Sequence, residues 1–140
     1  MSEPLTFHFD VDGENFTSAG EASLAMKKNL RQLGFSPEII RRVSIAMYEG
    51  EINMVIHAGG GEADVSIYPE RIEIVLTDHG PGIENVELAM REGFSTAPEN
   101  IRNLGFGAGM GLPNMKRNTD TMTVSTALGV GTTIVMTVSV

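Results

Sequence analysis

The 140-residue sequence has no cysteine and no tryptophan, and its 10 lysine and arginine residues stand against 18 aspartate and glutamate residues. Without cysteine, the chain forms no disulfide and offers no thiolate to a metal, an iron–sulfur cluster or a nucleophilic reaction. No apolar run approaches the roughly 18 residues that a membrane span needs, and the acidic N-terminus lacks the pattern of a secretory signal. We therefore expect a soluble, cytoplasmic protein with a single domain, residues 1–140.

The formal net charge of -8 also narrows the range of ligands. An acidic protein repels nucleic-acid backbones and anionic lipids, so neither is expected as its main partner. The charge is uneven, because residues 25–48 carry five bases and one acid. Such a block can be a solvated helix surface, or it can be a docking patch for an acidic partner. The five bases are Lys27, Lys28, Arg31, Arg41 and Arg42.

The first half of the chain alternates between strand and helix patterns. Apolar residues alternate with polar ones over 5–11, which predicts a half-buried strand, and a helix is expected from Thr17 or Ser18, either of which can cap it, to Gly34. A second helix, with Ser36 as N-cap and Pro37 at its first position, should run to about residue 57 and end at a glycine run. Residues 63–68 and 72–76 alternate again and predict a hairpin.

The second half is expected to hold a long functional loop over 79–109, with a short helical piece at 84–91, before a third helix at 111–118. Two strands, 122–124 and 134–140, should follow. Because helices and hairpins are segregated, the expected fold class is α+β. It is a two-layer α/β sandwich, with a mixed, mostly antiparallel sheet and helices on one face.

Three polar residues recur every four positions on the otherwise apolar second helix. Glu49, Asn53 and His57 therefore lie on nearly one stripe. Ordinary surface positions would also account for them. Gly50 favours a functional role for this stripe over ordinary surface positions. A glycine inside a helix costs roughly 1 kcal/mol relative to alanine and usually lets another group approach the backbone.

Three glycine-containing motifs follow in the chain. The motif Asp78-x-Gly80-x-Gly82 comes directly after a strand, where a carboxylate can accept from an exocyclic amine such as that of adenine. Glycines at 105, 107, 109 and 111 precede Leu112 and the third helix, and can present successive N–H groups to phosphate oxygens. A last motif lies at 129–133. Taken alone, the first and last also fit simple turns.

In this order and on these elements, the four motifs resemble the Bergerat-type ATP-binding fold shared by gyrase, histidine kinases and MutL. The length, and the Glu four residues before the Asn, are most similar to bacterial anti-sigma-factor serine/threonine kinases of partner-switching systems. The resemblance implies ATP and Mg²⁺ as cofactors. It also implies a sigma factor and an antagonist protein as partners, and suggests a homodimer.

The resemblance assigns roles to individual residues. Glu49 is implied as the catalytic base or as the group that orients the attacking hydroxyl, and Asn53 as the Mg²⁺ ligand. Asp78 should hold the adenine amine, with Gly82 lining the base pocket and Thr133 supporting the contact, while residues 84–104 form a lid. The implied nucleotide-binding set is Asn53, Asp78, Gly80, Gly82, Gly107, Gly109, Gly111, Leu112 and Thr133.

Two classes of function remain open at this level. The first is a kinase that phosphorylates a serine or threonine of a small antagonist protein, sequesters a sigma factor, or does both. The second is a nucleotide-dependent binding module or stress-signalling switch of the same fold without sigma-factor binding, or a stand-alone histidine-kinase-type ATPase domain. The presence of Glu49 favours chemistry, with Glu51, about 200° around the helix, as a rival carboxylate.

Overall fold

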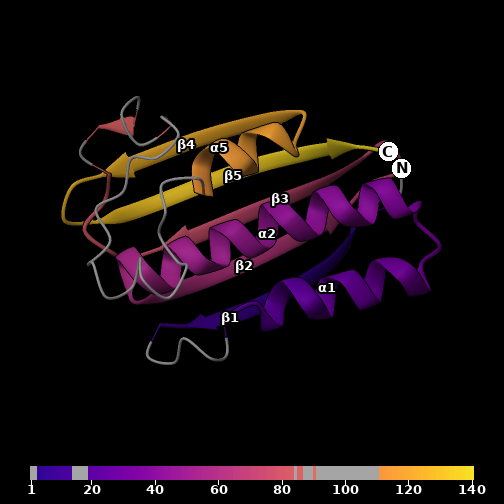
Figure 1. Cartoon of the computed structure of the whole chain (residues 1–140), viewed down its shortest axis with the longest axis horizontal. Coiled ribbons are helices and arrows are strands. Elements are labelled where there is room, and N and C mark those ends of the chain that lie inside the picture. The colour runs from indigo at the N-terminus through magenta and orange to yellow at the C-terminus, as the bar shows by residue number, and fades with distance from the viewer. Residues whose placement is uncertain (1–2, 14–18, 84, 87–89, 91–110) are drawn as a thin grey trace.

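The structure is a computed structural model that describes residues 3–13, 19–83, 85–86, 90 and 111–140. Five strands form one antiparallel sheet in the order β1-β2-β3-β5-β4, and three helices accompany it (Figure 1). The strands are β1 (Leu5–Asp12), β2 (Gly60–Ile67), β3 (Arg71–Asp78), β4 (Thr121–Ala127) and β5 (Gly131–Ser139). The helices are α1 (Glu21–Gln32), α2 (Pro37–Ala58) and α5 (Gly111–Arg117).

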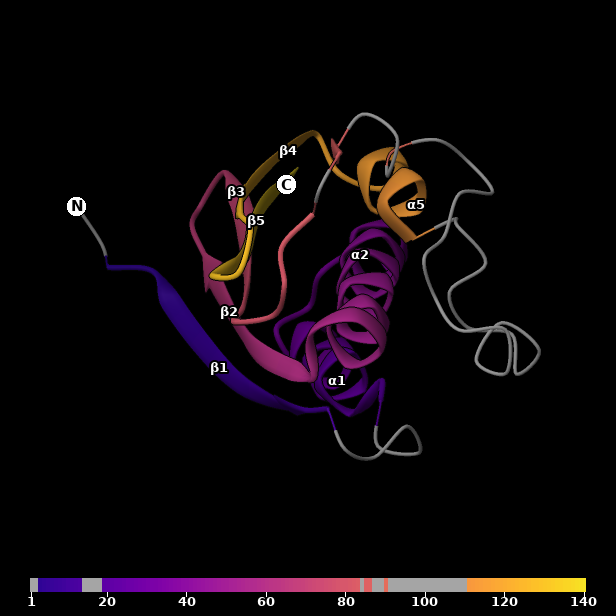
Figure 2. The ribbon, with the colours of Figure 1, turned by 90° about the vertical axis from the view of Figure 1, so that its left-hand side faces the viewer.

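All three helices lie on one face of the sheet, so the molecule has two layers (Figure 2). The strand periodicity explains this arrangement, because alternate residues of a strand point to opposite faces. Ile72, Ile74 and Leu76 of β3 are buried on the helix side, as are Ile134, Met136 and Val138 of β5. The expected α+β sandwich is confirmed, and every strand pair described is antiparallel.

The turn between α1 and α2 fixes how these two helices lie side by side. Gly34 has a φ of 84°, its N–H donates to the Arg31 carbonyl, and the N–H of Phe35 donates back to the Leu30 carbonyl. This pair of bonds is a Schellman motif, which ends a helix at a glycine in the left-handed region. Ser36 then caps α2 by accepting from the Ile39 N–H, as the sequence predicts.

The structure corrects the expected start of the first helix. Helix α1 begins at Glu21, with Gly20 in the N-cap position and no side-chain cap of its own. Thr17 and Ser18 lie outside the described residues. The cap comes instead from a distant carboxylate, Glu51 of α2, which is 3% exposed. Glu51 accepts the N–H groups of Gly20, Ala22 and Ser23 at 2.9, 3.1 and 2.9 Å.

Strand bounds differ modestly from expectation, and most strands are longer. Glycines 60 and 61 belong to β2 rather than to a loop, and β4 extends to Ala127. The short helical piece at 84–91 lies mostly outside the described residues, although the Met90 N–H donates to the Val86 carbonyl at 2.9 Å. Among the residues described, no helix combines the length and the apolar character needed to cross a membrane.

Candidate active site

Helix α2 places Glu49 at the centre of the candidate site. The residue is half-buried and lies where α5 packs against α2. Desolvation raises the pKa of the Glu49 carboxyl, and a hydrogen bond from the Asn114 side chain on α5 opposes that rise. The carboxylate is therefore kept in a partly dry place with one neutral donor, which suits a group that must accept a proton.

Asn114 is itself oriented by a neighbour on the same helix. The Arg117 guanidinium donates to Asn114 Oδ1 at 3.2 Å, so the amide nitrogen of Asn114 is the part left to donate to Glu49. Asn114 has no signal in the sequence, because its contact with Glu49 depends on how α5 crosses α2. No periodicity within either helix predicts that crossing.

Asn53 lies one turn beyond Glu49 and faces the start of α5. A methyl group added to Gly111 would come within 2.6 to 3.1 Å of the Asn53 side-chain amide, so this glycine lets the amide and the backbone of α5 lie in contact. An amide oxygen is a hard ligand of the kind that Mg²⁺ accepts. The residue type and the close approach of the α5 backbone therefore fit a Mg²⁺–phosphate site.

A second group of polar residues surrounds Asp78 at the end of β3. Asp78 Oδ1 accepts the Gly80 N–H at 3.0 Å and the Thr132 N–H at 3.1 Å. The Thr132 hydroxyl is 3.0 Å from that of Thr126, which also accepts the Ile83 N–H at 2.8 Å. Because both of these backbone donors use Oδ1, Oδ2 of Asp78 is the oxygen that can receive a ligand amine.

The structure does not bring Thr133 into this group, which corrects that assignment. Thr133 follows Thr132 in β5, and successive strand residues point to opposite faces. Thr132 pairs with Asp78 on the helix side, whereas Thr133 pairs with Thr77 on the other. The buried residues Ile134, Met136 and Val138 share the parity of Thr132, so the alternation alone could have identified Thr132.

The remaining predicted site residues divide into three sets. Gly80 packs against Ala58 and Gly82 against the carbonyl of Ala127, which holds the 80–82 turn between the end of α2 and the end of β4. Leu112 is 7% exposed and belongs to the core. Gly107, Gly109 and the predicted lid lie outside the described residues, apart from Asn85, Val86 and Met90 within the lid.

Gly50 and His57 of α2 each interact with a residue of β3. The close approach that Gly50 permits comes from Leu76 of β3, since an added Cβ would lie 2.1 Å from a Leu76 methyl carbon. Gly50 is therefore a packing position of the helix on the sheet. At the end of α2, desolvation lowers the pKa of His57 while the negative charge of Asp78 opposes that shift. Neutral His57 is thus favoured beside the Asp78 group.

The comparison with known families matches nearly the whole chain. A family model described as the histidine kinase-like ATPase domain matches residues 15–138. The chain belongs to this family. The match spans α1 to β5, and therefore includes both the Glu49–Asn53 stripe and the Asp78 group.

The relatives of this chain include a named kinase. The serine/threonine-protein kinase RsbT of Bacillus subtilis is 32% identical over 108 residues, covering 74% of this chain and 75% of that protein. The anti-sigma F factor of Caldanaerobacter subterraneus subsp. tengcongensis is 34% identical over 138 residues, covering 95% and 90%. That of Clostridium acetobutylicum is 31% identical over 137 residues, covering 94% and 89%.

Proposed function

We propose that the protein is an ATP-dependent serine/threonine kinase that acts in the cytoplasm as an anti-sigma regulatory factor. It phosphorylates a small antagonist protein and also binds a sigma factor. The observation that carries the kinase assignment is the half-buried Glu49 carboxylate, which accepts a hydrogen bond from Asn114. On α2, Glu49 lies one helical turn before Asn53. The names of the relatives, a serine/threonine kinase and anti-sigma factors, support the two halves of the proposal.

Asp78 holds the nucleotide by its base in this proposal. Its Oδ1 is occupied by the Gly80 and Thr132 N–H groups, which orient the carboxylate, and Oδ2 accepts the exocyclic amine of adenine. A carboxylate fixed by two backbone donors loses little further entropy when it binds a ligand. The Thr126 and Thr132 hydroxyls form a polar wall beside it.

At the other end of the site, Asn53 would hold a Mg²⁺ ion with its side-chain oxygen. When bound, Mg²⁺ neutralises charge on the ATP phosphates. Glu49 accepts the proton of the attacking serine or threonine hydroxyl, or holds that hydroxyl in line with the γ-phosphate. Phosphoryl transfer depends mainly on positioning and charge, so a fixed base beside a bound nucleotide is chemically sufficient.

Replacing Asp78 with Asn separates nucleotide recognition from folding. Asn retains an Oδ1 that can accept the Gly80 and Thr132 N–H groups, but it presents an NH₂ group where Asp78 presents Oδ2. The NH₂ group of the new Asn and the exocyclic amine of adenine, both hydrogen-bond donors, would then face each other. We expect ATP affinity to fall by about 100-fold or more with little loss of stability. Calorimetric titration measures the ATP affinity, and a thermal melt measures the stability. Unchanged ATP affinity would remove Asp78 from adenine recognition.

Replacing Asn53 with Ala tests the metal assignment. Because the proposed ligand oxygen is lost, we expect Mg²⁺ no longer to strengthen nucleotide binding, while binding measured in EDTA stays close to that of the wild type. Calorimetry of ATP binding with and without Mg²⁺ gives the comparison. An equal Mg²⁺ effect in wild type and variant would contradict the role of Asn53.

The transfer reaction itself is tested with γ-labelled ATP, the purified chain and an extract of its native cytosol. The proposal expects label on one small protein, bound through acid-stable phosphoserine or phosphothreonine. Acid-labile label would indicate phosphohistidine instead. If the chain binds ATP and a partner but transfers no label, it is a nucleotide-dependent binding module.

A further inference from the structure

A second surface of interest lies away from the nucleotide site, where the end of α1 meets the start of α2. It is an open groove with a volume of about 540 Å³. The Schellman turn brings Phe35 and Pro37 to its end, and Ile40 and Ile45 of α2 contribute further apolar surface.

Cations stand on both sides of this apolar floor. Lys27 and Arg31 come from α1, one helical turn apart, and Arg41 comes from α2. Within the described part of the chain, none of the three forms an ion pair. Three unpaired cations around one groove, in a protein with a net charge of -8, attract acidic ligands to this place.

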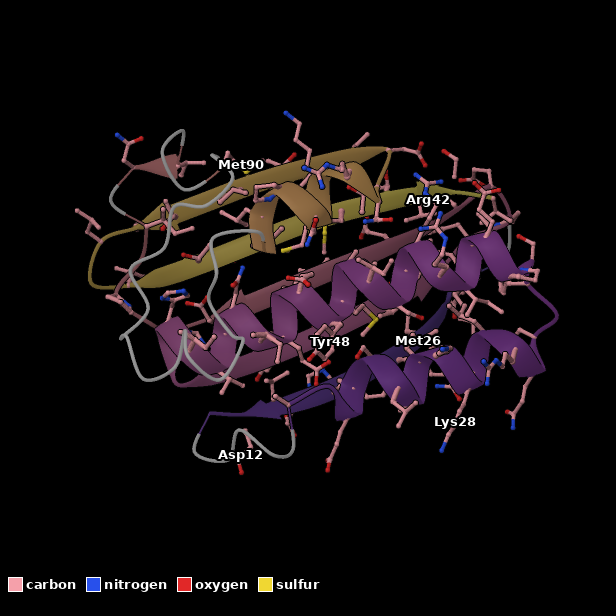
Figure 3. All side chains as sticks on the ribbon, viewed as in Figure 1. Asp12, Met26, Lys28, Arg42, Tyr48 and Met90 are labelled. Atoms are coloured by element: carbon pink, nitrogen blue, oxygen red, sulfur yellow. The ribbon has the colours of Figure 1, made fainter. Side chains whose placement is uncertain are left out.

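The other two bases of the same sequence block do not belong to the groove. Arg42 forms an ion pair with Asp120 at 3.2 Å and also donates to the Asn118 carbonyl at 3.1 Å. Lys28 is exposed and projects away from α2 on the outer side of α1 (Figure 3). The predicted basic patch is therefore reduced to three residues that share a hollow, and Lys28 becomes a natural control.

The groove also holds an unsatisfied polar group. The buried Ser44 Oγ has no hydrogen-bond partner among the described residues. A buried hydroxyl without a partner is costly, because folding removes its water without replacing it. Because the Oγ atom is buried, a carboxylate or a carbonyl oxygen of a bound chain would supply the missing acceptor only after the Ser44 side chain turns towards the groove.

We propose that this groove docks an acidic segment of a protein partner, with an apolar side chain seated on Phe35 and Ile40 between carboxylates that pair with Lys27, Arg31 and Arg41. The inference rests on the proposed function, since the partner is the protein whose serine or threonine hydroxyl Glu49 activates or orients. Ile45 lines the groove and lies one helical turn before Glu49, so a segment docked there continues along α2 towards the base.

The chemistry of the groove favours a peptide over other acidic ligands. A nucleotide would use the cations but leave most of the apolar floor uncovered. A flat anionic membrane cannot fill a concave groove, and the net charge of the chain opposes its approach. A segment that alternates acidic and apolar side chains satisfies the cations, the floor and the Ser44 hydroxyl together.

A random peptide display library, selected on the ATP-loaded full chain, tests this directly. Counter-selection uses a variant with Lys27, Arg31 and Arg41 all replaced by Glu. We expect the surviving peptides to be rich in Asp and Glu around an apolar residue. One labelled survivor is then titrated against Arg31→Glu, where affinity should fall at least tenfold, and against the matched control Lys28→Glu, where it should change less than twofold.

Several outcomes would overturn the inference. They are survivors without acidic enrichment, a counter-selection that leaves no survivor because every selected peptide also binds the triple variant, and equal losses from Lys28→Glu and Arg31→Glu. Competition of the peptide by anionic vesicles, by ADP or by the unlabelled chain itself would assign the groove to a membrane, a nucleotide or a second copy. Because ATP binding is measured for each variant and no phosphoryl transfer is required, failure of the groove is distinguishable from failure of the kinase.

Discussion

Glu49→Gln is expected to lower the rate of phosphoryl transfer by roughly 10²- to 10⁴-fold while leaving ATP affinity nearly unchanged. Gln keeps an oxygen that can accept the Asn114 hydrogen bond, so the contact between α2 and α5 survives. Gln has no negative charge, so it can neither take the proton of the attacking hydroxyl nor hold that hydroxyl with an anionic acceptor. Transfer of labelled phosphate to the partner gives the rate, and calorimetry gives the affinity. Wild-type transfer by this variant would remove Glu49 from the mechanism.

The pH dependence of the same reaction offers a second measure of Glu49. A base works only when deprotonated, and burial raises the pKa of this carboxyl. The rate should therefore fall as the pH drops through a pKa above that of an ordinary glutamate. The Asn114 hydrogen bond lowers that pKa, so Asn114→Ala should move the acid limb to higher pH. A variant that only damaged packing would lower the rate without moving the limb.

Glu51→Ala is expected to destabilise the fold by about 3 kcal/mol or more, a loss of roughly 10 °C in melting temperature for a chain of this size. The change removes the oxygens that accept three N–H groups at the start of α1, two of them in buried contacts. It also removes a negative charge from the positive end of that helix dipole. Urea unfolding followed by circular dichroism measures the effect.

Ser36→Ala is the matched control for Glu51. Ser36 also caps a helix, but it does so at an exposed site with a single 3.3 Å bond. Its loss should cost about 1 kcal/mol or less. If the two variants were equally stable, the buried carboxylate would not be the main anchor of α1. Glu51→Gln should lie between them, since it keeps one acceptor oxygen and loses the charge.

Much of the fold could be predicted because its signals are local. Alternation fixes which face of each strand is buried, and Ser36-Pro37 fixes the start of α2. The start of α1 could not be predicted, because its cap is a carboxylate about 30 positions further along the chain. A glutamate on an apolar helix gives no sign of which backbone donors it will meet.

The candidate site shows the same division between local and distant signals. The four-residue spacing places Glu49 and Asn53 on one stripe, and the structure keeps them there. Asn114 and the groove depend instead on how helices pack, which needs coordinates. Thr132 is a different case, because its parity with Ile134 was available in the sequence. Gly50 inside a helix correctly predicts a close approach, but the group that approaches it is Leu76 of the sheet.

Helix α2 sets the distance between the docking groove and Glu49. Its 22 residues extend over about 33 Å, and the step from Ile45 in the groove to Glu49 in the candidate active site is about 6 Å along the axis. An extended chain covers that step in about two residues. The phosphorylated serine or threonine of a docked partner should therefore lie only a few residues from its acidic segment. A substrate of this protein would then carry a spacing that can be recognised in its sequence alone.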